Sequence, residues 1–71
     1  MTAIAEKIET LHKRLKAWHE DHPGKQLEIV DDIDSELEIG STAADVGQDK
    51  VAEKCYERAR DSAKVVLGIR V

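Results

Sequence analysis

The feature that most constrains this 71-residue chain is a strict apolar repeat over its first 22 residues. Apolar or ring-bearing side chains recur there at alternating intervals of three and four residues, at Met1, Ile4, Ile8, Leu11, Leu15, Trp18 and His22. Because an α-helix completes a turn every 3.6 residues, this spacing aligns them along one side of a helix. Thr2 can cap its start, and Pro23-Gly24 disfavours its continuation. The sequence therefore predicts a helix over about residues 2–21.

A second long helix is predicted over about residues 42–67. Its apolar side consists mostly of small residues at helical spacing, namely Ala52, Tyr56, Ala59, Ala63 and Val66, widened by Val51, Cys55 and Ser62. Small side chains let another helix approach closely, so this side is predicted to pack against the large residues of 2–21. Ser41 or Thr42 can cap its start, and Gly68 can end it. Gly47 costs about 1 kcal/mol relative to alanine, so the regular helix can begin after it.

The middle segment, about 25–40, fits two structures. As a short helix it ends at Gly40 and has one apolar side, formed by Ile29, Val30, Ile33 and Leu37. As a β-hairpin over about 26–39 it pairs two alternating segments across an acidic turn, and its β-branched residues favour strands. Pro23-Gly24 before the segment and Gly40-Ser41 after it suit three helices. The preferred prediction is an all-α bundle of two long helices with a short middle helix; the alternative is an α+β fold with the hairpin.

The length allows one domain, 1–71, with a small core. The predicted core consists of Ile4, Ile8, Leu11, Leu15, Trp18, Val30, Ile33, Leu37, Val51, Ala52, Cys55, Tyr56, Ala59, Ala63 and Val66. So small a core leaves little stability after the entropy of ordering the chain, which makes oligomerisation an expectation. The apolar side of 2–21 is wider than one small-residue helix covers. A homodimer is therefore predicted, with an interface formed by Ile4, Ile8, Leu11, Leu15 and Trp18.

Charge is segregated along the chain, whose formal net charge is −4. Residues 27–49 contain eight carboxylates and no lysine or arginine, whereas the segments on either side lean basic. This acidic segment has three interpretations: a solvated face, internal pairing with Lys50, Lys54 and Arg58, or a docking surface for a basic protein. For the last of these, the predicted partner-binding residues are Glu28, Asp31, Asp32, Asp34, Glu36 and Glu38.

Metal, cofactor and catalytic sites are not indicated by the residue pattern. Of the three histidines, His19 and His22 are spaced to share an ion, but a transition metal usually needs three or four ligands. Cys55, the single cysteine, is predicted to be a buried packing residue rather than a nucleophile. The sequence has no glycine-rich phosphate loop and no nucleophile-and-base arrangement. We therefore predict no enzymatic activity and no cofactor.

The same composition argues against two other classes of binding. Net negative charge with scattered basic residues is unlike a nucleic-acid-binding surface, so no direct nucleic-acid binding is expected. No apolar run is long enough for a membrane span, and the polar side of 2–21 mixes both signs of charge, so no membrane association is expected. With one cysteine and no signal-peptide pattern, the predicted location is cytoplasmic.

These observations predict a small non-enzymatic binding or regulatory protein that acts by protein–protein contact. Its acidic middle segment would block a basic surface of the partner, in the way of the small inhibitors carried by mobile elements. The alternative is a structural or assembly subunit that oligomerises through residues 2–21 and has no regulatory target.

Overall fold

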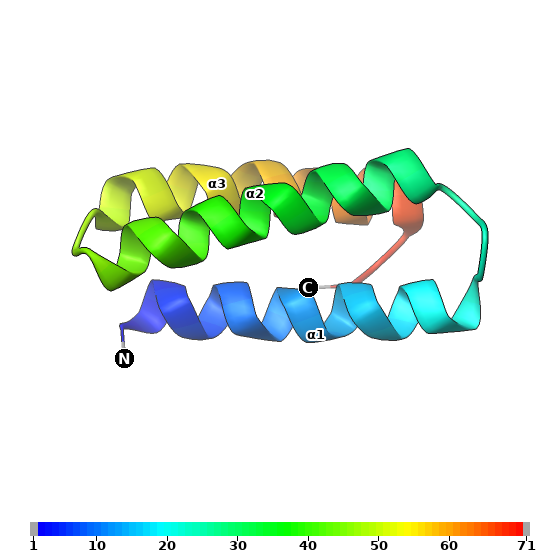
Figure 1. Cartoon of the computed structure of the whole chain (residues 1–71), viewed down its shortest axis with the longest axis horizontal. Coiled ribbons are helices and arrows are strands. Elements are labelled where there is room, and N and C mark those ends of the chain that lie inside the picture. The colour runs from blue at the N-terminus through cyan, green and yellow to red at the C-terminus, as the bar shows by residue number, and fades with distance from the viewer. Residues whose placement is uncertain (1, 71) are drawn as a thin grey trace.

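The computed structural model describes residues 2–70, which form three helices, each antiparallel to the one before it (Figure 1). α1 spans Ala3–Asp21, α2 spans Leu27–Asp45 and α3 spans Asp49–Ser62, which continues as a π-helical turn, η1, over Ala63–Leu67. α2 and α3 lie side by side, and α1 packs along their common face (Figure 1). Within residues 2–70 there is no β-strand. The predicted all-α bundle is thus confirmed, and the alternative hairpin at 26–39 is wrong.

α1 begins and ends where its sequence signals predict. The Thr2 hydroxyl accepts a hydrogen bond from the Ala5 backbone N–H (3.3 Å), which caps the first turn. At the other end, the His22 N–H donates to the Trp18 carbonyl (3.0 Å), and Gly24 adopts a positive φ of 80° in the following turn. Met1, the first residue of the predicted apolar repeat, lies outside the described residues.

The boundary between the second and third helices differs from the prediction. α2 continues through Gly40 to Asp45, and α3 starts only at Asp49. The turn lies at Gly47, whose φ of +81° is the left-handed conformation that glycine adopts most easily. Gly40 is instead buried inside α2, and the Thr42 hydroxyl, predicted as a possible cap, donates to the Glu38 carbonyl within the helix (3.1 Å). The middle helix is therefore long rather than short.

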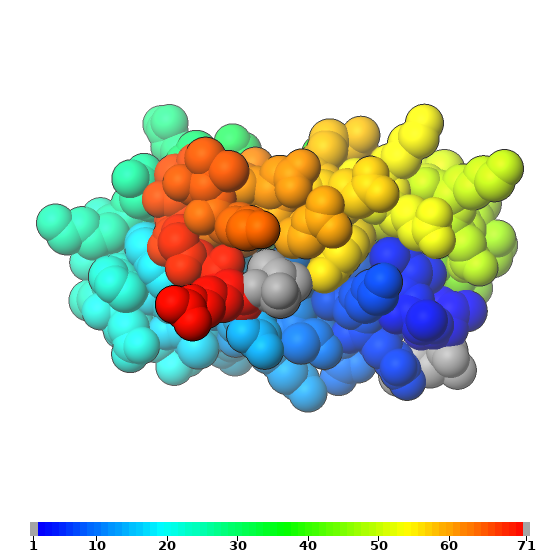
Figure 2. Space-filling model, turned by 180° about the vertical axis from the view of Figure 1, so that it is seen from behind, coloured from blue at the N-terminus to red at the C-terminus, as the bar shows by residue number. Residues whose placement is uncertain are grey.

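The chain returns to α1 after η1. Gly68 ends the helical segment with a φ of +70°, as its position predicts. The next residue, Ile69, is buried and belongs to the hydrophobic core. The Arg14 guanidinium donates to the Arg70 carbonyl (2.7 Å), which holds the tail along α1. Seen from behind, this tail lies between α1 and the end of α3 (Figure 2). It covers part of the edge between α1 and α3 (Figure 2).

The core lies between the three helices and matches most of the predicted set. The buried apolar residues are Ile4, Ile8, Leu11, Leu15, Val30, Ile33, Leu37, Ala43, Ala44, Ala52, Cys55, Tyr56, Ala59, Ala63, Leu67 and Ile69. Trp18 is partly buried against this core. Val51 and Val66 were predicted inside, but each is 44% exposed. Ala52 takes the inward position next to Val51, and the wider π turn shifts the inward position from Val66 to Leu67.

No helix in the described part of the chain is both long and apolar enough to span a membrane.

Candidate protein-binding surface

α2 places the six predicted partner-binding carboxylates on two different sides of the bundle. Asp31, Asp34 and Glu38 follow each other at helical spacing and line hollows between α2 and α1, and Asp45 continues this line. Asp32 and Glu36 lie on the opposite side, where α2 meets α3. Glu28 is exposed in the first turn of α2. The acidic segment is therefore two surfaces rather than one.

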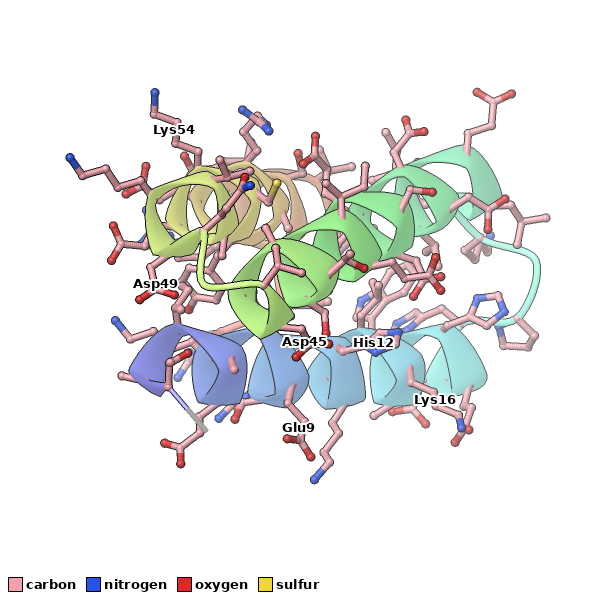
Figure 3. The ribbon with its side chains drawn as sticks, turned by 60° about the vertical axis from the view of Figure 1, so that its left-hand side comes forward. Glu9, His12, Lys16, Asp45, Asp49 and Lys54 are labelled. Atoms are coloured by element: carbon pink, nitrogen blue, oxygen red, sulfur yellow. The ribbon has the colours of Figure 1, made fainter. Side chains whose placement is uncertain are left out.

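Two of these carboxylates are used within the chain. Asp34 Oδ1 lies within hydrogen-bond distance of His12 Nε2, and in Figure 3 the His12 ring extends from α1 toward α2. Glu36 makes a two-pronged contact with Arg58, from Nε to Oε1 (3.1 Å) and from Nη2 to Oε2 (3.3 Å). Hydrogen bonding to the Glu36 carboxylate, together with its charge, raises the pKa of Arg58. These two pairs tie α2 to α1 and to α3.

The remaining carboxylates point into solvent without an ionic partner. Glu28, Asp31, Asp32 and Glu38 are exposed, and none has a basic nitrogen within 4 Å among residues 2–70. The same holds for Asp45. Lys16 lines the same hollow as Asp31 and Asp34, yet it forms no ion pair with them. Of the three basic residues proposed for internal compensation, only Arg58 binds a carboxylate of α2.

The most continuous acidic surface is the line of exposed carboxylates beside α1. It consists of Asp31, Glu38 and Asp45, which we call the α1-side row. Successive members are seven residues apart, so they repeat every second turn along one edge of α2. Like charges three or four residues apart destabilise a helix, and Asp34 lies at that distance from both Asp31 and Glu38. Asp45 adds a further cost because it lies in the last turn, near the negative end of the helix dipole.

The residues predicted to form a dimer interface are placed differently. Ile4, Ile8, Leu11 and Leu15 are between 0% and 7% exposed and are buried against α2 and α3 of the same chain. The apolar side of α1 is indeed too wide for one helix, but two helices of its own chain cover it. These four side chains therefore do not offer the free surface that the predicted interface requires. Trp18 keeps some exposure, and its indole stacks on the His22 ring at 4.2 Å.

The other chemically active side chains are dispersed. Within residues 2–70, no three His, Cys, Asp or Glu side chains converge where a metal ion could be held. His12 contacts Asp34, and the His22 ring nitrogen Nδ1 lies 2.9 Å from the Trp18 carbonyl, to which it donates. Of the two histidines spaced for a shared ion, His22 is thus oriented by another contact, whereas Nδ1 of His19 is buried and has no hydrogen-bond partner among residues 2–70.

An exposed apolar patch that was not predicted lies beside the α2–α3 turn. Ile39, Val46 and Val51 line one hollow there and are 57%, 67% and 44% exposed. A signal was present: Ile39 and Val51 each immediately precede a small residue, Gly40 and Ala52, that occupies the inward helical position. Apolar residues adjacent to the inward position lie at the edge of the core and are candidates for surface contacts.

Cys55 is buried, at 1% exposure, beneath the Glu36–Arg58 pair, and Arg58 Nη2 lies 3.6 Å from its sulfur. Burial is the main reason that the pKa of the thiol is raised above its ordinary value of 9.0, and the negative charge of Glu36 adds to it. The thiolate, which is the reactive form, is therefore disfavoured in the folded chain.

We expect Cys55 to react with an aqueous thiol reagent only as fast as the chain unfolds. Cys55→Ala should fold with a loss of about 1 kcal/mol. Because the folded-state pKa is the higher one, the stability linked to the neutral thiol is complete below pH 9.0 and declines as the pH rises beyond it. Denaturant unfolding at neutral and alkaline pH should show this decline in the natural chain and less of it in Cys55→Ala. Rapid labelling under native conditions would contradict the packing.

Comparisons with protein-family models, with curated proteins and with solved structures find no match to this chain.

Proposed function

We propose that this chain is a non-enzymatic protein-binding module whose α1-side row docks on a basic surface of another protein. The observation that supports this most is that Asp31, Glu38 and Asp45 are exposed along one edge of a helix with no ionic partner among residues 2–70. Repulsion of Asp31 and Glu38 by Asp34, one turn away from each, and the position of Asp45 at the negative end of the helix lower the stability of a small domain. A basic partner would relieve this repulsion on binding.

The rigidity of the row favours a role in recognition. It lies on a regular helix of 19 residues that is fixed to α1 through Asp34 and to α3 through Glu36. The backbone positions that carry these charges are therefore fixed before binding, and less backbone freedom is lost in the complex. Such a row would steer a basic surface and cover it, which is how a small regulator can inhibit its target. A cytoplasmic location, where the single thiol stays reduced, suits this role.

The alternative of an assembly subunit that uses α1 is not favoured by any contact of the described residues. Four of the five side chains needed for that interface are already buried inside the chain.

Two matched variants test the proposal. The row variant, Asp31→Asn/Glu38→Gln/Asp45→Asn, removes exposed unpaired charges, whereas the bridge variant, Asp34→Asn/Glu36→Gln, removes charges already bound within the chain. A partner captured from the native host with the natural chain should bind the row variant more slowly, with an on-rate reduced on the order of tenfold. Added salt should mimic that loss for the natural chain, because it screens exposed charges.

The bridge variant tests whether binding depends on the positions of the row carboxylates or only on the total negative charge of the chain. It removes two negative charges, whereas the row variant removes three. If the unpaired row carboxylates make the contact, the on-rate of the bridge variant should be nearer to that of the natural chain than the on-rate of the row variant is. Equal affinity of the natural chain and the row variant, measured by surface-based kinetics, would remove the proposed mechanism.

A further inference from the structure

The exposed apolar patch beside the α2–α3 turn has no use in the proposed function so far. Ile39, Val46 and Val51 surround one hollow, which we call the turn hollow, and they are 57%, 67% and 44% exposed. Single apolar residues on a surface need no explanation, but three around one hollow of a small domain mark an interaction site. Covering them would remove apolar area from water, which is the main driving force for protein association.

The turn hollow is continuous with the α1-side row. Glu38 lines the turn hollow and also the hollow between α2 and α1 that Asp45 lines. Asp45 directly precedes Val46 in the chain, and in Figure 3 it lies between the end of α2 and α1. The apolar patch and the carboxylates therefore form one surface, and a protein that docks at the Asp45 end of the row also meets the patch.

The charge around the turn hollow is acidic. Among residues 2–70, Glu38 is the one charged side chain that lines it, and Glu38 has no ion pair. Ile39 also lines the neighbouring hollow between α2 and α3, where one cation, Arg58, faces three carboxylates and is already bound by Glu36. In a symmetric contact of two copies at this place, the same carboxylates would lie against one another. The surface therefore favours a basic occupant over a second copy of this chain.

The spacing of the α1-side row indicates which kind of segment fits it. Asp31, Glu38 and Asp45 are seven residues apart, which places them about 10.5 Å apart along α2. A helix laid along α2 offers cations at the same interval when they also recur every seven residues. Residues on one side of an extended strand recur at about 6.6 or 13 Å and do not match. An amphipathic helix also presents an apolar stripe beside its cations, as the turn hollow requires.

We propose that the occupant of this surface is an amphipathic basic helix of the partner. Its lysine or arginine side chains lie over the α1-side row, and a large aliphatic side chain at one end enters the turn hollow. This inference rests on the proposed function, which supplies the basic partner, and it adds the secondary structure and the apolar anchor of that partner. Attraction by the row governs the rate of encounter, whereas burial of the anchor slows dissociation.

The probe for this inference is a fluorescein-labelled helical peptide of three heptads, with lysine every seven residues and leucine on the adjacent stripe. The control peptide has the same lysines and has alanine in place of the leucines, so it keeps the charge and a high helix propensity. Fluorescence anisotropy and stopped-flow kinetics follow the binding of each peptide to the full chain. The natural chain should bind the leucine peptide about tenfold more tightly than the alanine peptide, with the difference in the off-rate.

Two matched variants locate the contact of the leucine side chains. The patch variant, Ile39→Ser/Val46→Ser, removes two apolar side chains of the turn hollow. The end variant, Leu27→Ser/Val65→Ser, removes two exposed apolar side chains that do not line it (50% and 83% against 57% and 67%). The patch variant should lose the preference for the leucine peptide and should bind the alanine peptide as the natural chain does. The end variant should keep the preference, and circular dichroism checks that both variants retain the natural helicity.

The outcomes distinguish this inference from the proposed function. A patch variant that keeps the preference for the leucine peptide would overturn this inference alone, as would an end variant that loses it equally or a natural chain that binds both peptides equally. A row variant that binds both peptides at the natural on-rate would remove the proposed function and, with it, the charge match inferred here. Sedimentation equilibrium that shows a dimer of the natural chain and a monomer of the patch variant would assign the turn hollow to a second copy and overturn the inference.

Discussion

Leu11→Asp is expected to leave the chain unfolded, whereas Leu27→Asp is expected to leave it folded. Leu11 has 0% exposure at the centre of α1, and Leu27 is 50% exposed at the start of α2. Removing a buried leucine side chain costs about 2–5 kcal/mol, and burying an ionised carboxylate adds several kcal/mol more. A domain of this length has a total stability of about 4–10 kcal/mol, so the sum reaches or exceeds it.

Far-ultraviolet circular dichroism at neutral pH distinguishes the two leucine variants directly. Leu11→Ala provides a graded version, with the helical signal retained and the free energy of unfolding lowered by about 2–5 kcal/mol. A cooperative melting transition in Leu11→Asp close to that of the natural chain would mean that α1 does not pack against α2 and α3 in solution.

Gly40→Leu is expected to have the second-largest effect, because Gly40 is buried directly against side chains of α3 and α1. A β-carbon placed on Gly40 would lie 3.1 Å from the β-carbon of Cys55 and 3.1 Å from Cδ1 of Ile8. Both distances are shorter than ordinary contacts, so a larger side chain forces the helices apart. Overpacking of this kind costs about 1–3 kcal/mol and sometimes more.

The control for Gly40 is its exposed neighbour on the same helix. Ser41→Leu introduces the same side chain at an exposed position, where it meets no close neighbour in the core. The melting temperature of this variant should stay near that of the natural chain. Gly40→Ala is a milder probe, since alanine favours the helix by about 1 kcal/mol and the two close contacts oppose that gain. A Gly40→Leu variant as stable as Ser41→Leu would contradict the close approach of the helices.

The fold was predictable where local and global signals agree. In α1 the apolar repeat, the Thr2 cap and the Pro23-Gly24 stop all point to one helix, and its bounds are confirmed. Gly40 was misinterpreted because a glycine before a serine can end a helix or let a second helix approach. Choosing between the two requires knowing that Cys55 and Ile8 lie opposite, which depends on tertiary structure.

The candidate surfaces were predictable only in part. Residue counts located the acidic segment, and helical spacing alone groups Asp31, Glu38 and Asp45 on one edge. Which edge faces α1 depends on the handedness of the bundle, and the sequence does not encode that in any local pattern. The contacts of Asp34 with His12 and of Glu36 with Arg58 join residues 22 positions apart, so only the folded chain distinguishes bound from unpaired carboxylates.

The most direct measurement of the role of the α1-side row needs no partner: it is the melting temperature of the row variant compared with that of the bridge variant. If the exposed carboxylates have no internal compensation, the row variant should gain about 1 kcal/mol, because Asp31 and Glu38 no longer repel Asp34 and Asp45 no longer lies charged at the helix end. That gain corresponds to a rise of about 4–8 °C for a domain of this size. The bridge variant relieves the same repulsion at Asp34 but loses its ties to α1 and α3, so it should melt lower than the row variant. A row variant that melts below the natural chain would show that these charges stabilise the fold and are not held for a partner.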